Sequence, residues 1–256
     1  MRGARTPSLV LLLLAAASAT AAERLRVLFP EQPPFTFTNA DGSVRGERFE
    51  VVRAAMNRAG FEPEFESVPG PRILGLLRED RDSFCTLSWY YTEERAAFAL
   101  YTPAYYYDQL SVVVRRDAAE RFRGFERFAD LLTHSELRMG ATNNLSNGPY
   151  VDRLMHASGV KLTLQRVENP HQLWQWLNDD RVDFVLRSVG ELEYRQSRNE
   201  DGVATLVALR YPDLTGVIPE YLMCSRRFGA ERMARLRTAI EALMKSGTGA
   251  EERAGH

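Results

Sequence analysis

One arginine, set just inside a predicted helix, is the residue of this chain best suited to binding a ligand. The segment Thr92-Glu93-Glu94-Arg95 follows an apolar run that ends at Leu87. A guanidinium presents a rigid fork of donors that matches a carboxylate, and backbone N–H groups at a helix start also favour an anion. Arg95 is therefore a candidate to hold a carboxylate. The alternative is a solvent-exposed arginine paired with Glu94 or another acid.

Aromatic residues flank this arginine in the sequence. Trp89 and Tyr90 precede it, and the run Tyr105-Tyr106-Tyr107 follows it. Such rings can stack on a ligand. Aromatic residues near a strand end more often belong to the core or to the rim of a site, so only Trp89 and Tyr90 are retained as candidate ligand contacts.

The usual motifs of catalytic and metal sites are absent from the sequence. It contains no Gly-x-Ser-x-Gly, His-Glu-x-x-His or Cys-x-x-Cys motif and no phosphate-binding glycine-rich loop. The four histidines have no metal-ligand spacing; they are His134, His156, His171 and His256. We therefore expect no metal, no cofactor and no catalytic residue.

The first 22 residues have the pattern of a signal peptide. A basic start, Met1-Arg2-Gly3-Ala4-Arg5, precedes an apolar run over residues 9–17 and small residues up to Ala22. The apolar run is too short to span a bilayer, and no later segment is apolar enough to do so. The pattern predicts cleavage near Ala22 and export, most simply to a bacterial periplasm.

Composition argues against several classes of partner. The chain has 45% hydrophobic and 26% charged residues and a formal net charge of -1, as is ordinary for a globular protein. No basic run interleaved with aromatic residues points to nucleic acid or to a membrane surface. We expect a soluble monomer that binds a small molecule and no nucleic acid.

The two cysteines leave an open question at this stage. Cys85 and Cys224 both lie in apolar runs that predict strands. An exported protein can form a disulfide, but the positions alone favour two buried free thiols.

Strands and helices alternate along the rest of the chain. Predicted strands cover residues 25–29, 61–68, 83–87, 110–114, 137–139, 162–167, 182–186 and 221–224. Predicted helices cover residues 46–59, 72–77, 128–132, 149–155, 190–198 and 230–245, and two more begin at Thr92 and near Asn169. This order favours an α/β protein with two similar units built on parallel strands.

The order of these segments resembles the family 3 extracellular solute-binding proteins, the polar amino-acid-binding type of the type II periplasmic binding fold. The resemblance rests on Pro33-Pro34-Phe35, on Asp41-Gly42 with Gly46, on the segment from Ser88 to Arg95, and on Thr102-Pro103-Ala104-Tyr105. It implies two Rossmann-like lobes with mixed, mostly parallel sheets joined by a two-segment hinge. Lobe 1 would comprise residues 23–110 plus 217–256 and lobe 2 residues 111–216, with hinge segments near 111–117 and 214–219.

The resemblance also implies a ligand site and a cysteine pair. Arg95 matches the arginine that holds the ligand carboxylate, Tyr90 a nearby polar contact, and Thr142-Asn143-Asn144 a loop that closes from lobe 2. Cys85 and Cys224 would be neighbours. Strand ends at residues 29–31, 88–90, 140–144 and 187–188 should face one cleft. The candidate ligand-binding residues are Glu31, Phe35, Arg72, Ser88, Trp89, Tyr90, Arg95, Thr142, Asn143, Asn144, Arg187 and Ser188.

Two departures from the family pattern bear on the ligand. Arg187-Ser188 stands where amino-acid binders usually have the aspartate that holds the ammonium. An arginine there would favour a second carboxylate or another anion, unless Arg187 points away from the cleft. Gly70 stands near the usual position of an aromatic residue that stacks on the ligand, and Trp89 and Tyr90 are candidate replacements.

These observations predict a periplasmic protein that captures a small carboxylate-bearing ligand for an ABC permease, with dicarboxylates or other anions preferred. One alternative is a dehydratase of the same fold, with Glu191 as general acid and Arg95 and Arg187 as carboxylate clamps. A second alternative is a receptor that presents its ligand-bound form to a membrane sensor.

Overall fold

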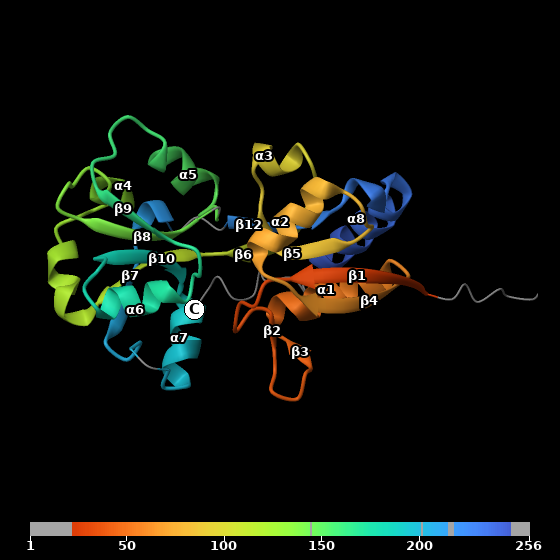
Figure 1. Cartoon of the computed structure of the whole chain (residues 1–256), viewed down its shortest axis with the longest axis horizontal. Coiled ribbons are helices and arrows are strands. Elements are labelled where there is room, and N and C mark those ends of the chain that lie inside the picture. Colours follow the sequence, from red (N-terminus) through yellow and green to blue (C-terminus); the bar gives the residue numbers. More distant parts are fainter. Residues whose placement is uncertain (1–21, 144, 201, 215–217, 247–256) are drawn as a thin grey trace, which may run out of the picture.

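The protein is described from a computed structural model, which covers residues 22–143, 145–200, 202–214 and 218–246. Two groups of strands and helices lie side by side along the long axis (Figure 1). The predicted signal peptide, except for Ala22, and Asn144 fall outside the described residues.

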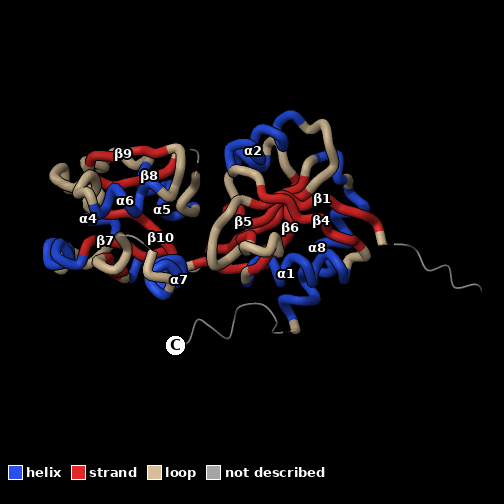
Figure 2. Tube along the Cα trace, turned by 60° about the horizontal axis from the view of Figure 1, so that its bottom comes forward, coloured by secondary structure: helices blue, strands red, loops and turns tan. Residues whose placement is uncertain are grey.

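The first group is built on a five-stranded sheet of order β4-β1-β5-β12-β6. Its strands are β1 (Glu23–Phe29), β4 (Phe61–Ser67), β5 (Cys85–Tyr90), β6 (Leu100–Asp108) and β12 (Ile218–Cys224). Its helices are α1 (Glu47–Arg58), α2 (Gly70–Glu79), the single turn α3 (Glu93–Ala96) and α8 (Ala230–Lys245). The apolar residues of α1 and α8 form one core cluster with the sheet and those of α2 form another, so the helices cover opposite faces (Figure 2).

The second group is built on a five-stranded sheet of order β11-β7-β10-β8-β9. Its strands are β7 (Leu110–Arg115), β8 (Arg138–Thr142), β9 (Thr163–Val167), β10 (Phe184–Ser188) and β11 (Leu206–Leu209). Its helices are α4 (Phe128–Leu131), α5 (Pro149–Met155), α6 (Gln172–Asn178) and α7 (Val189–Ser197). Short elements complete the fold: the ribbon β2 (Phe37–Thr38) and β3 (Val44–Arg45), and the 3-10 turns η1 (Arg116–Phe122), η2 (Pro212–Leu214) and η3 (Arg226–Phe228).

Within the described residues, each sheet has two parallel and two antiparallel pairings. The parallel pairings join strands linked by helices, as the alternation predicts. The antiparallel pairings involve β7 and β12, the strands that follow a crossing between the two groups. The sheets are therefore mixed, as predicted. They have as many antiparallel as parallel pairings, whereas the sequence predicts mostly parallel ones.

We infer that each sheet forms the centre of one lobe, lobe 1 around β1 and lobe 2 around β7. β6 ends at Asp108 and β7 begins at Leu110, so the first crossing is at Gln109. The predicted hinge at residues 111–117 lies next to this crossing, and its residues 111–115 belong to β7, which pairs with β10 and β11 inside the second sheet. The second crossing runs between Leu214 and Ile218, and residues 215–217 lie outside the described part of the chain.

Strand β6 was not predicted, although it is the longest strand described. Its Thr and Tyr residues favour a strand, but Pro103 cannot donate a backbone hydrogen bond. The structure resolves this conflict because β6 lies at the edge of its sheet, where one side of the strand needs no partner.

The start of α1 depends on a glycine. Gly46 precedes the helix with φ 120°, and a Cβ there would lie 2.1 Å from the carbonyl oxygen of Phe35. Only glycine allows this close approach. The contact holds the segment of Phe35 against the first turn of α1, and so positions the buried Arg48.

Cys85 and Cys224 form a disulfide, with Cα atoms 4.0 Å apart on the paired strands β5 and β12. The expectation that they are neighbours is confirmed, and the alternative of two free thiols is wrong. The bond joins strands 139 residues apart in the sequence, which restricts the unfolded chain strongly.

Candidate functional site

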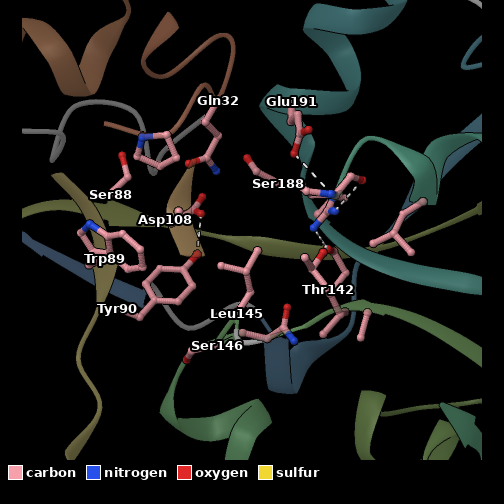
Figure 3. A pocket seen from close by; sticks show the side chains of 18 of the residues that line it. Gln32, Ser88, Trp89, Tyr90, Asp108, Thr142, Leu145, Ser146, Ser188 and Glu191 are labelled. Carbon is pink, nitrogen blue, oxygen red and sulfur yellow. Dashed lines mark hydrogen bonds and ion pairs between the residues drawn. The ribbon is translucent and has the colours of Figure 1, made fainter. Parts of the chain in front are cut away.

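A cavity of about 190 Å³ lies between the two sheets and receives residues from both lobes. All four predicted strand ends contribute to it, as Figure 3 shows for several of their side chains. Lobe 1 supplies Pro30, Glu31, Ser88, Trp89, Tyr90, Arg95 and Asp108, and lobe 2 supplies Gly140, Thr142, Asn143, Arg187, Ser188 and Glu191, among other residues.

Arg95 is positioned by the short helix α3. The Thr92 hydroxyl caps this helix by accepting a hydrogen bond from the Arg95 N–H at 3.2 Å. The Arg95 side chain is buried, stacks over Trp89 with its guanidinium carbon 5.0 Å from the ring centre, and donates to the Tyr90 carbonyl oxygen at 3.1 Å. Burial lowers the pKa of Arg95, which reflects the cost of removing its charge from water. The exposed-helix alternative is wrong: Glu94 pairs with Arg78 at 2.7 Å.

Trp89 lies where the sequence departs from the family pattern. Its indole N–H donates to the Thr86 hydroxyl at 2.9 Å, which fixes the ring. A Cβ on Gly70 would lie 3.7 Å from the ring, so the indole occupies the space beside this glycine. Trp89 thus provides an aromatic surface at the place where Gly70 cannot.

Ser88 sits in a bulge of β5. Between the pairs Tyr221–Trp89 and Met223–Thr86, β5 has one more residue than β12. Ser88 has φ 70°, and its N–H donates to the Tyr105 hydroxyl at 2.9 Å in place of a strand partner. Its hydroxyl oxygen is buried with no hydrogen-bond partner among the described residues. A strained residue with an unsatisfied polar atom at a cavity wall is typical of a binding site.

Sequence analysis missed a buried charged cluster at the bottom of the cavity. Asp108 at the end of β6 and Glu220 on β12 both line the cavity. Arg48 of α1 contacts both, with its Nη2 atom 3.1 Å from Asp108 and 2.5 Å from Glu220. The Tyr90 hydroxyl donates to Asp108 at 2.7 Å. Burial raises the pKa of Glu220 to about 8 against the opposing effect of Arg48. We call Arg48, Asp108 and Glu220 the acidic floor.

Two lobe 2 residues close the cavity near the end of β8. The Thr142 hydroxyl oxygen is buried without a hydrogen-bond partner among the described residues, and is available to a ligand. Asn143 lines the cavity, and its side-chain amide donates to Glu168 at 2.6 Å, which orients the amide.

Arg187 faces the cavity but is engaged by the protein. It donates to the carbonyl oxygens of Leu186 at 3.3 Å and Pro170 at 3.2 Å, and its Nε atom lies 3.8 Å from Glu191. Glu191 also pairs with Arg195 at 3.3 Å. Glu191 therefore lies between two arginines of lobe 2, and the Nε atom of Arg187 is buried without a hydrogen-bond partner among the described residues. Ser188 lines the cavity directly before α7, where the missing aspartate would stand.

Two predicted site residues lie elsewhere, and a third has a protein partner. Phe35 is outside the cavity lining because its ring packs on the Arg48 guanidinium at 4.0 Å. Arg72 is also outside it, since its exposed side chain extends along α2 to Glu79 at 3.8 Å. The structure therefore places neither side chain on the cavity wall. Glu31 lines the cavity, but its carboxylate accepts hydrogen bonds from the N–H and hydroxyl of Thr38.

A comparison with protein-family models identifies the lineage. The model of the bacterial extracellular solute-binding proteins, family 3, matches residues 25–251. The chain belongs to this family. Its α/β fold with mixed sheets is that of the type II periplasmic binding proteins. A search of curated proteins found no match. Among the described residues, no group of three or more His, Cys, Asp or Glu side chains could hold a metal ion.

Solved structures of this fold include proteins with different roles. An ancestral arginine-binding protein bound to arginine is 20% identical with a TM-score of 0.67, over 89% of this chain and 95% of that one. An ancestral amino-acid-binding protein, described as a precursor of cyclohexadienyl dehydratase, is 17% identical with a TM-score of 0.67, over 88% and 92%. A histidine kinase sensor domain is 19% identical with a TM-score of 0.67, over 88% and 92%. At these identities the likeness shows the fold alone.

Proposed function

We propose that this protein is a periplasmic solute-binding protein that closes two lobes around a small carboxylate-bearing ligand and delivers it to an ABC importer. Arg95 holds the carboxylate, Trp89 provides a flat apolar surface, and Ser88 and Thr142 add hydrogen bonds from the two lobes. Closure traps the ligand without chemistry.

The observation that carries this proposal is the cavity between the lobes, with a buried arginine on one wall and unsatisfied hydroxyl oxygens on both walls. Buried polar atoms usually have partners, so a ligand that supplies them gains binding free energy. A carboxylate is the matching group for the buried guanidinium.

A thermal-shift screen of amino acids, organic acids and aromatic acids would find the ligand. A ligand present at 100 times its dissociation constant should stabilise the protein by roughly 2.7 kcal/mol. Arg95→Ala should then weaken binding of the best ligand at least 10- to 100-fold, because the carboxylate loses its charged partner, and Arg95→Lys should restore only part of the loss. Arg24→Ala, at an exposed arginine on β1, is the control. Equal binding by Arg95→Ala would refute the assignment.

The dehydratase alternative has one residue in its favour, since Glu191 lines the cavity. Arg187 and Arg195 both contact its carboxylate, however, at 3.8 and 3.3 Å, so this carboxylate is already engaged by lobe 2. Incubation of each ligand hit with the protein, followed by chromatography, tests this alternative. Slow consumption of a hit that stops in Glu191→Gln would favour the enzyme.

The coupling partner can be tested separately. One protein of similar fold is a sensor domain, so an ABC permease and a membrane sensor are both candidate partners. No helix in the described ranges is long and apolar enough to cross a membrane. Deletion of the gene should abolish uptake of the radiolabelled ligand if the partner is an importer. Unchanged uptake with loss of a transcriptional response would favour the sensor.

A further inference from the structure

We propose that Tyr105 is a positioning residue for ligand capture, whose hydroxyl holds Ser88 in the left-handed conformation that turns residues 88–90 toward the cavity. Tyr105 does not line the cavity itself. This inference rests on the proposed function. It gives a role to the segment Thr102-Pro103-Ala104-Tyr105, which lies in β6, on the far side of β12 from β5.

The strands on both sides of β12 bulge at the same level. Between the pairs made by Tyr221 and those made by Met223, β12 has the single residue Leu222, whereas β5 and β6 each have two residues. Tyr105 is itself an extra residue of β6, in a second shift of register next to the first. A bulge interrupts the regular hydrogen bonds of a sheet, so its backbone groups need other partners.

Two side chains of the β6 segment accept hydrogen bonds from N–H groups at the bulges. The Ser88 N–H donates to the Tyr105 hydroxyl at 2.9 Å. The Leu222 N–H donates to the Thr102 hydroxyl at 3.2 Å. The Thr102 hydroxyl donates in turn to the Pro103 carbonyl oxygen at 2.8 Å. The segment thus supplies side-chain acceptors at the point where the regular sheet pattern is interrupted.

The contact with Ser88 requires a long and firmly packed side chain. β5 and β6 are not neighbours, because β12 lies between them, so the acceptor must reach past a strand. Tyr105 is fully buried in the core cluster that β1, β5 and β12 form with α1 and α8. Packing fixes the ring, and the fixed ring places the hydroxyl. Burial also raises the pKa of Tyr105, so the hydroxyl is neutral at pH 7.

The conformation of Ser88 decides which side chains form the cavity wall that Figure 3 shows beside it. The left-handed region is unfavourable for serine, because its Cβ crowds the following carbonyl oxygen. Without the hydrogen bond, extended backbone and a one-to-one register become favourable, and a shift of one residue turns side chains to the opposite face. The disulfide holds β5 at Cys85, so the shift would fall on Trp89 and Tyr90. Arg95 would then lose the Tyr90 carbonyl oxygen, to which it donates at 3.1 Å.

Tyr105→Phe keeps the ring and removes only the acceptor. The Ser88 amide hydrogen, followed by NMR in deuterated water, should exchange at least tenfold faster in this variant. Tyr211→Phe is the matched control, because Tyr211 is also buried and its hydroxyl donates to the Phe122 carbonyl oxygen at 3.1 Å in lobe 2. It should leave the exchange of Ser88 within twofold. Each variant loses one buried hydrogen bond, so a general loss of stability affects both alike.

Binding is measured by isothermal titration calorimetry with L-arginine, L-glutamine, succinate and benzoate as probes. The probe that binds the unmodified protein most tightly should bind Tyr105→Phe at least tenfold more weakly. It should bind Tyr211→Phe within twofold. Because both variants lose a buried tyrosine hydroxyl, a difference between them reports on the site and not on stability.

Ser88→Gly provides the rescue. Glycine adopts the left-handed conformation without strain, so the bulge no longer depends on the tyrosine hydroxyl. With Ser88→Gly as the reference, the added Tyr105→Phe change should weaken binding of the same probe by less than threefold. The double variant should fold even if Tyr105→Phe alone does not. An equal loss of affinity in the two backgrounds would overturn the inference.

The outcomes separate this inference from the proposed function. Unchanged probe affinity in Tyr105→Phe, or the same loss in Tyr211→Phe, would overturn the positioning role and leave the carboxylate site intact. If no carboxylate binds the unmodified protein, the proposed function fails, and the exchange of the Ser88 amide decides the positioning role alone. Exchange in Tyr105→Phe within twofold of the unmodified protein would then overturn it, and tenfold faster exchange would support it.

Discussion

Each lobe has a cluster of charged side chains at the same cavity, and the two clusters differ in how their acids and arginines are paired. In lobe 1, Asp108 and Glu220 share the single cation Arg48. In lobe 2, the acids Glu191 and Glu200 are matched by Arg187 and Arg195. In lobe 2 each acid has an arginine of its own, whereas in lobe 1 two acids share one arginine and burial raises the pKa of one of them, Glu220, to about 8.

A histidine does not disturb the balance of the lobe 2 cluster. His171 lies 2.9 Å from Arg195, and burial, together with the nearby arginine, lowers its pKa. It is therefore neutral at pH 7, and lobe 2 presents no net charge from this cluster. The two clusters therefore differ in their number of cations, with one arginine for two acids in lobe 1 and two arginines for two acids in lobe 2.

The largest expected effect concerns the strands that carry the acidic floor. The disulfide joins β5 and β12, and the described part of lobe 2 has no such bond. The double variant Cys85→Ser/Cys224→Ser should lose roughly 4–5 kcal/mol of unfolding free energy, because the bond closes a long loop. Urea unfolding of the purified protein measures this. A loss below 1 kcal/mol would mean that the strand register alone holds lobe 1 together.

Removal of Arg48, the one cation of the acidic floor, should lower the unfolding free energy almost as much as loss of the disulfide. Arg48→Met leaves the buried Asp108 carboxylate without its counter-charge, next to the protonated Glu220, and we expect a loss of about 3–5 kcal/mol. Urea unfolding at pH 7 measures it, and exposed Arg53→Met on α1 serves as a control. A stability within 1 kcal/mol of the unmodified protein would contradict the unbalanced cluster.

The pH dependence of stability provides a third test of the floor. Glu220 binds its proton more tightly in the folded protein than in the unfolded chain, where its pKa is near 4.3. The contribution of Glu220 is therefore fully present below that value and is lost as the pH rises to about 8. This group alone should lower the unfolding free energy by up to about 1.4 kcal/mol per pH unit in that range. Comparison of urea unfolding for the unmodified protein and Glu220→Gln at pH 5, 6, 7 and 8 isolates it; equal slopes would exclude a raised pKa.

The smallest effect is expected in lobe 2. Arg187→Gln removes one cation from a cluster in which Glu191 keeps Arg195, so the loss should be about 1–2 kcal/mol. Binding of the best ligand should change by less than about threefold. Thermal unfolding and calorimetry measure the two quantities. A loss of binding comparable to that of Arg95→Ala would show that Arg187 holds the ligand after all, as the sequence suggests.

Local patterns were sufficient for much of the architecture. The bounds of α5 and α8 match their sequence predictions, because apolar spacing, a leading proline or glycine, and helix-forming residues all act within a few positions. Thr92 was recognised as a cap for the same reason, since its hydroxyl bonds a residue three positions away. Strand β6 was missed because it contains Pro103. A proline is tolerated in an edge strand, and only the sheet order shows that β6 is one.

The sequence by itself determined the alternating α/β plan, the helix that presents Arg95, and the aromatic residues next to it. Only the tertiary structure decided that Arg48, Asp108 and Glu220 meet, and that Arg187 is used by its own lobe. Residues 48, 108 and 220 come together because β6 leaves lobe 1 and β12 returns to it side by side. Propensity and capping depend on neighbours in the chain, whereas the charge balance of a buried site depends on which distant segments the crossings bring into contact.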